Sequence, residues 1–140
     1  MQSKKYKVIV KDLIKKGTFK RLSFPTSKST IRQEYLRLCS DGRGAGESAC
    51  MAVARYDDDI IASNNLRDIR QYCSVHEILY LTTLDILYIA YKKGVMTEAE
   101  VDHFLYLNIY DANPSRLPFI TLKSYLDSNP RIASIFKDTA

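Results

Sequence analysis

The chain has 140 residues and a mass of 16.1 kDa, which suits one domain and leaves no room for a second catalytic domain. Apolar residues make up 46% of the chain and charged residues 26%. This globular composition excludes a disordered tail, a collagen-like chain and a coiled-coil rod. No stretch approaches the ~18–20 consecutive apolar residues that a membrane helix needs, so we expect no membrane-bound role.

The N-terminal residues and the cysteines bear on the location of the protein. The first residues are basic, but no apolar segment long enough for a signal peptide follows them. The three cysteines, Cys39, Cys50 and Cys73, are odd in number and form no CxxC pair, which is typical of reduced thiols. We therefore expect a cytoplasmic protein.

Positive charge is concentrated in the first 40 residues. This segment holds eleven Lys and Arg against two acids, a net charge of +9, while the remaining hundred residues carry −4. A pI near 9.1 with the excess positive charge in one segment is typical of a protein that contacts phosphate backbones. A lysine-rich helix face that is simply exposed to solvent explains the same charge equally well. The candidate RNA contacts are Lys4, Lys5, Lys11, Lys15, Lys16, Lys20 and Arg21.

The first elements follow from spacing and turn residues. Residues 8–16 are apolar at helical spacing and end at a glycine, which predicts a helix, although residues 8–10 alone fit a short strand. Residues 19–24 alternate between apolar and polar and predict a strand. A capping box of Thr30 and Gln33 then predicts that a helix begins at Thr30.

Helices and strands alternate through the rest of the chain. After a glycine-rich loop we expect a helix over 47–55, a strand over 59–63, a helix over 65–72, a strand over 78–81, a helix over 84–93 and a helix that a capping box opens at Thr97. This order predicts an α/β protein, a three-layer α/β/α sandwich with a largely parallel central sheet. The domain spans residues 1–140, and residues 111–140 add a terminal helix or a loosely docked C-terminal extension.

Several common active sites are missing from the sequence. There is no GxxxxGK[ST] loop, and the glycines at positions 42, 44 and 46 follow a charged loop where a nucleotide-binding GxGxxG run would follow a strand. His76 and His103 have no cysteine partners at zinc-ligand spacing and no partners for nucleophilic catalysis. What remains is a set of acids and amides near predicted strand ends.

These acids and amides are Glu34, Glu47, Asn64, Asn65 and Asp68. Side chains at the carboxyl ends of parallel strands converge, and clustered carboxylates suit Mg²⁺ or Mn²⁺. Structural explanations stand beside this one. Glu47 also suits the positive end of a helix, Asn65 with Asp68 suits a helix cap, and Glu34 suits an exposed helix surface.

Three segments, 44–54, 59–69 and 79–87, resemble in their order the second half of a PIN domain. The shared pattern is a helix that starts with glycine and glutamate, an apolar strand that ends in polar residues, and a further strand leading into a helix that ends in Lys-Lys-Gly. The resemblance covers residues 20–110.

This resemblance implies a divalent-metal-dependent endoribonuclease, often the toxin of a bacterial toxin–antitoxin pair. It implies Mg²⁺ or Mn²⁺ as the cofactor, RNA as the substrate, an antitoxin protein as a partner, and a homodimer. By position, Glu34, Glu47 and Asp68 would be the catalytic residues. The implied metal ligands are Glu34, Glu47, Asn64, Asn65, Asp68 and Asp12.

Two departures from the PIN pattern favour an alternative function. PIN domains begin with a strand that ends in an aspartate, whereas here residues 8–10 are followed by Lys11 and then Asp12. Asn64 and Asn65 fall where the family places an aspartate, and this loss of charge weakens Mg²⁺ binding. The alternative is a catalytically degenerate PIN-like module that binds nucleic acid or protein.

Overall fold

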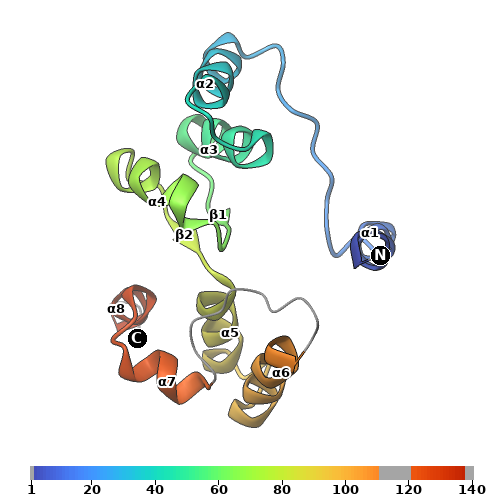
Figure 1. The fold of residues 1–140 in the computed structure, drawn as a ribbon, viewed down its shortest axis with the longest axis vertical. Coiled ribbons are helices and arrows are strands. Elements are labelled where there is room, and N and C mark those ends of the chain that lie inside the picture. The colour runs from blue at the N-terminus through green and yellow to red at the C-terminus, as the bar shows by residue number, and fades with distance from the viewer. Residues whose placement is uncertain (1, 111–120, 138–140) are drawn as a thin grey trace.

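A computed structural model describes the backbone of residues 2–110 and 121–137, and the side chains of residues 7–107 and 121–134 (Figure 1). In chain order its elements are α1 (Gln2–Lys15), α2 (Ser29–Ser40), α3 (Ala45–Asp57), β1 (Ile61–Ala62), α4 (Leu66–Val75), β2 (Tyr80–Leu81), α5 (Thr83–Lys92), α6 (Glu98–Tyr110), α7 (Leu122–Asp127) and α8 (Arg131–Lys137).

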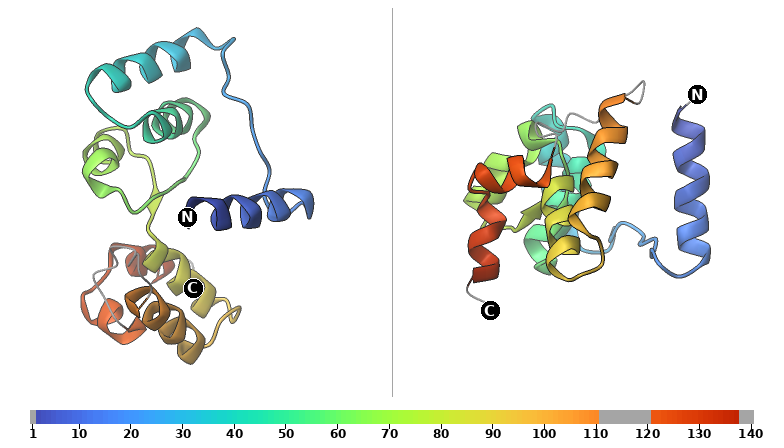
Figure 2. Two further views of the ribbon diagram at one scale, coloured as in Figure 1. Left: turned by 45° about the vertical axis from the view of Figure 1, so that its right-hand side comes forward. Right: turned by 90° about the horizontal axis from the view of Figure 1, so that it is seen from below.

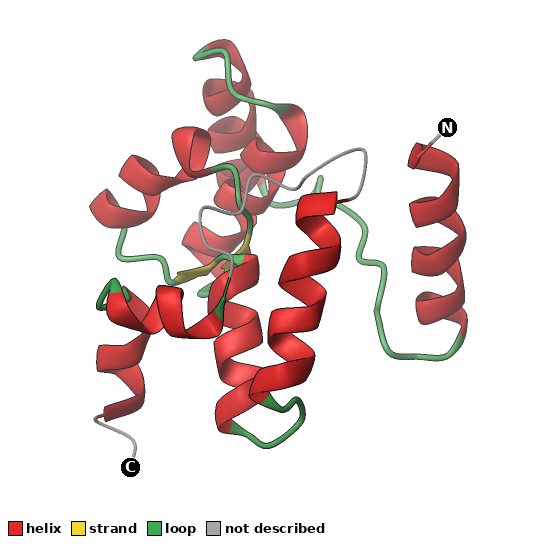
Figure 3. Ribbon diagram, turned by 60° about the horizontal axis from the view of Figure 1, so that its bottom comes forward, coloured by secondary structure: helices red, strands yellow, loops and turns green. Residues whose placement is uncertain are grey.

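The prediction of a three-layer α/β/α sandwich with a largely parallel central sheet is wrong. Within the described residues the protein is mostly helical, and its sheet consists of β1 and β2 alone (Figure 3). These two strands are parallel, with Ile61 opposite Tyr80 and Ala62 opposite Leu81. The predicted strand over 19–24 does not form, and its Leu22 is 71% exposed. Two strands of two residues each offer too little surface for helices to cover on both faces, so the helices pack mainly on one another.

Helices α2, α3 and α4 lie next to one another (Figure 2), and together with residues in and beside the two strands they form a first core. Leu38, Met51 and Ile69 are fully buried and come from these three helices in turn. The small residues Ala52 and Ala54 on α3 are also buried, which lets α2 pack closely against α3. The helical spacing read from residues 47–55 is therefore confirmed.

Helices α5 to α8 enclose a second core. Its buried side chains are Leu84, Leu87, Tyr88, Val101, Leu105, Leu122, Tyr125 and Ile132. Residues 121–134, part of the predicted C-terminal extension over 111–140, thus contribute to this core. The rest of that prediction for 111–120 and 138–140 lies outside the described residues. The capping box at Thr97 is confirmed, because its hydroxyl accepts from the Glu100 amide at 3.2 Å.

Arg131 joins the two cores. Its Nη2 donates to the Tyr80 carbonyl at 2.7 Å, and its guanidinium lies 3.9 Å from the centroid of the Tyr80 ring. The same nitrogen is 3.4 Å from Oδ2 of the buried Asp85. The C-terminal helix α8 is therefore fastened to β2 and to the start of α5.

Helix α1 lies apart from both cores, as Figure 1 and the right view of Figure 2 show. Residues 8–10, which also fit a strand, are helical and exposed, with Val8 at 67%. The chain turns after the helix at Gly17, whose φ of 76° is a left-handed value that favours glycine. Among the described residues, no helix is both long and apolar enough to cross a membrane.

Candidate functional site

Three of the predicted site residues, Glu47, Asn65 and Asp68, lie together where the starts of α3 and α4 meet. The amide nitrogen Nδ2 of Asn65 donates to Glu47 Oε1 at 3.2 Å and to Asp68 Oδ2 at 3.0 Å. Gly44 makes room for this cluster, because a Cβ at that position would overlap Glu47 Oε2. Two carboxylates from α3 and α4 thus share one amide donor.

Asn64 faces a different neighbour. Its Nδ2 donates to Thr83 Oγ1 at 2.7 Å, and its Oδ1 accepts from the Thr83 amide at 2.9 Å. Both polar atoms of the Asn64 amide are therefore hydrogen-bonded to Thr83, the first residue of α5. The side chain ties β1 to α5, which is a structural role.

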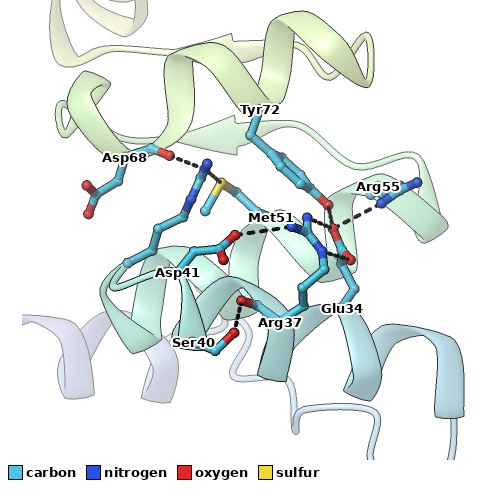
Figure 4. A network of polar contacts seen from close by, with 9 residues as sticks. Glu34, Arg37, Ser40, Asp41, Met51, Arg55, Asp68 and Tyr72 are labelled. Atoms are coloured by element: carbon cyan, nitrogen blue, oxygen red, sulfur yellow. Dashed lines mark hydrogen bonds and ion pairs between the residues drawn. The ribbon is translucent and has the colours of Figure 1, made fainter.

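Glu34 lies in a separate polar network (Figure 4). Its carboxylate accepts from Arg37 at 2.7 and 2.9 Å, from Arg55 at 3.0 Å and from the Tyr72 hydroxyl at 2.7 Å. Hydrogen bonds from Arg37 above all hold the pKa of this carboxyl at about 2, against the opposing effect of burial. These bonds fasten α2 to α3 and α4, and Glu34 does not join the cluster around Asn65.

Asp12 is also remote from the cluster, because it lies on α1 and pairs with Lys16 at 2.7 Å. The predicted acids therefore divide among three places. In the part of the chain that the structure describes, no group of three or more His, Cys, Asp or Glu side chains is placed to hold a metal ion. Glu47 and Asp68 provide oxygen donors that suit Mg²⁺ or Mn²⁺, but Asn65 presents its nitrogen toward them.

The basic residues gather on α1 and the segment after it. Lys7, Lys11 and Lys15 are four residues apart and form one exposed row along the helix. Lys16 is paired with Asp12, and no other ion pair of α1 occurs among the described side chains. Lys4 and Lys5 lie on the same helix, but their side chains are outside the described set.

A groove of about 640 Å³ lies between α1 and residues 19–21, and we call it the basic groove. Its cations are Lys7, Lys11, Lys20 and Arg21, and its apolar part consists of Val10, Ile14 and Phe19. The Phe19 side chain is 52% exposed. The groove thus combines four positive charges with an aromatic ring that solvent reaches.

Three cations of this groove, Lys11, Lys20 and Arg21, are among the predicted RNA contacts, whereas Lys7 and the apolar part were not predicted. Phe19 was expected to point from a strand, and the structure places it after the helix in a turn whose amides donate to the Leu13 carbonyl. The apolar stripe of α1 and the glycine that turns the chain back on it were the available signals.

Comparisons with known proteins supply no name for this site. No protein-family model matches the chain, and neither the curated proteins nor the solved structures contain a match.

Proposed function

We propose that this chain binds single-stranded RNA through the basic groove and does not hydrolyse it. The observation that carries the proposal is the arrangement of four cations around the exposed Phe19 ring. Proteins that hold single strands combine cations that follow the phosphates with aromatic rings on which bases stack. Paired bases in a duplex are stacked on one another, so an exposed ring favours a single strand as the ligand.

The position of the acids supports binding over hydrolysis. A metal-dependent nuclease needs several oxygen ligands around one point, and Glu34 and Asp12 are both held elsewhere. The resemblance of residues 20–110 to PIN domains supports RNA as the ligand and stays a prediction. An antitoxin partner and a homodimer likewise stay predictions of that resemblance.

The test is the binding of a short, fluorescently labelled oligouridylate by the full chain at several salt concentrations. A Lys7→Gln, Lys11→Gln double variant should bind more weakly, and its slope of log K against log salt should fall by about 1.4, since each phosphate contact to a single strand contributes about 0.7. The matched control is Lys93→Gln with Lys123→Gln, which removes the same charge from exposed positions outside the groove.

Equal losses in both double variants would show that only net charge matters and would contradict the proposed groove. Undetectable binding by the parent chain at low salt would contradict it as well. We also expect the oligouridylate to remain intact when it is incubated with the chain and Mn²⁺.

A second candidate function, a Mg²⁺- or Mn²⁺-dependent endoribonuclease, is favoured by the cluster of Glu47, Asn65 and Asp68. Calorimetric titration with Mn²⁺ tests it, with Glu47→Gln as the variant that keeps size and removes one charge. Micromolar binding that is lost in the variant, together with cleavage of the oligomer, would replace the proposal above. We expect neither, because both carboxylates accept hydrogen bonds from the Asn65 amide nitrogen and neither Glu34 nor Asp12 joins them.

A further inference from the structure

The strand β1 has an open edge. The amides of Ile61 and Ser63 each donate at 3.0 Å to carbonyls of the chain around β2. Successive residues of a strand face opposite sides, so the amide and carbonyl of Ala62 point away from β2. Among the described residues, no turn, loop or side-chain hydrogen bond reaches the Ala62 backbone, and Ala62 is exposed.

The other edge of the sheet is covered differently. The Tyr80 carbonyl, which points away from β1, accepts from Arg131 at 2.7 Å. The guanidinium of Arg131 also stacks on the Tyr80 ring. The sheet is therefore closed at β2 and open at β1, and an open edge is a template for a further strand.

A second groove, of about 510 Å³, lies along β1, and we call it the edge groove. Its apolar lining includes Leu22, Phe24, Ala49, Val53, Ile60 and Ala62. Ile60, directly before β1, is 58% exposed. Asp57 and Asp59 also line the groove, and Asp57 pairs with Lys28 at 2.9 Å whereas Asp59 has no ion pair among the described side chains.

We propose that the edge groove takes an extended segment of a partner protein, which adds to β1 as a third strand. Only an extended polypeptide presents backbone donors and acceptors at the spacing of Ala62, and the apolar lining suits a segment with apolar residues at alternating positions. The free Asp59 carboxylate favours a lysine or arginine at the end of that segment. The same negative charge disfavours a nucleic acid in this groove.

The probe is a blocked synthetic peptide, Lys-Val-Thr-Val-Lys, titrated into the full chain. Ala62→Pro removes the outward amide while the bonds of Ile61 and Ser63 to the β2 side stay in place, and proline is tolerated at strand edges. We expect Ala62→Pro to weaken binding at least about fivefold, the loss of one hydrogen bond. The control Val95→Ala, at an exposed position outside the edge groove, should bind like the parent, and circular dichroism should show both variants folded.

The charge of the partner is tested separately. Asp59→Asn should weaken binding of the lysine-ended peptide and leave a glutamine-ended peptide unaffected. Three results would overturn the proposal: no binding by the parent at millimolar peptide, equal binding by a folded Ala62→Pro variant, or displacement of the peptide by the RNA oligomer. The first two results would show that no peptide adds to β1 as a strand. The third would show that the peptide and the RNA bind to the same surface.

Discussion

Glu34 shows how one residue type serves two roles that the sequence alone does not separate. Its carboxyl is only 6% exposed and accepts from two arginines and a tyrosine. A glutamate that follows a predicted strand is also a suitable metal ligand. The sequence around Glu34 does not indicate its contacts with Arg55 and Tyr72, because these residues lie on α3 and α4. The prediction of Glu34 as a catalytic residue lacked these long-range partners.

The depressed pKa of Glu34 makes stability depend on pH. Because the folded value is about 2 against an ordinary 4.5, the contribution is complete above pH 4.5 and is lost as the pH falls toward 2. We expect Glu34→Gln to lower the free energy of unfolding at neutral pH by about 2 kcal/mol, since half-exposed Arg37 is partly screened by solvent. Urea denaturation at pH 7 and pH 3 measures both effects.

The variant should lose less stability than the parent between these two pH values, because its amide does not titrate. An equal loss in both proteins would show that Glu34 does not govern the acid limb of the stability profile.

Phe19 carries the base contact in the proposed function. Phe19→Leu keeps an apolar side chain in the basic groove but removes the ring, and stacking is worth about 1–3 kcal/mol per base. We expect oligouridylate affinity to fall about fivefold or more, with the salt slope unchanged because no cation is lost. Phe19→Tyr should restore the affinity, and failure of this rescue would count against stacking.

At the scale of the elements, helices were predicted well where local signals decide them. The periodicity of residues 47–55 and the capping box at Thr97 were both confirmed. The capping box at Thr30 was wrong, because the helix already begins at Ser29 and Lys28 is the N-cap residue without a side-chain bond. The strand expected over 19–24 was also wrong, since a strand needs a neighbour and none pairs with that segment among the described residues.

The start of α5 offers a test of local capping. The Thr82 hydroxyl accepts from the Asp85 amide at 3.2 Å, and Asp85 Oδ2 accepts from the Thr82 amide at 2.8 Å. We expect Thr82→Ala to lower the free energy of unfolding by about 1 kcal/mol, and Thr82→Ser, which keeps the hydroxyl, to cost much less. Thermal or urea denaturation measures the difference, and equal effects would mean that lost methyl packing matters more than the cap.

At the scale of the whole molecule, the charge distribution was predictable but the architecture was not. The excess of positive charge in residues 1–40 is evident from counting, and much of it lies on and just after α1, apart from both cores. Alternating helices and short apolar runs suggested a large parallel sheet. Among the described residues, the runs at 59–63 and 78–81 pair only with each other, and the paired part is two residues long in each.

The candidate site, like the fold, was predictable from the sequence only in part. Glu47, Asn65 and Asp68 come together because β1 and the starts of α3 and α4 meet, which their order after predicted elements indicated. The pairing of Asn64 with Thr83 depends on a tertiary contact that spacing does not encode. Asp12 pairs with Lys16 four residues on in the same helix, and this local contact is one that the spacing alone could have indicated.

The most direct test of the central claim is NMR mapping of amide shifts in the isotope-labelled full chain as oligouridylate is added. If RNA binds in the basic groove, the largest shifts will fall on Lys7, Lys11 and the segment 19–21, and the Glu47 and Asn65 signals will stay in place. Shifts centred on Glu47, Asn65 and Asp68, or no shifts at all, would contradict the proposed binding surface.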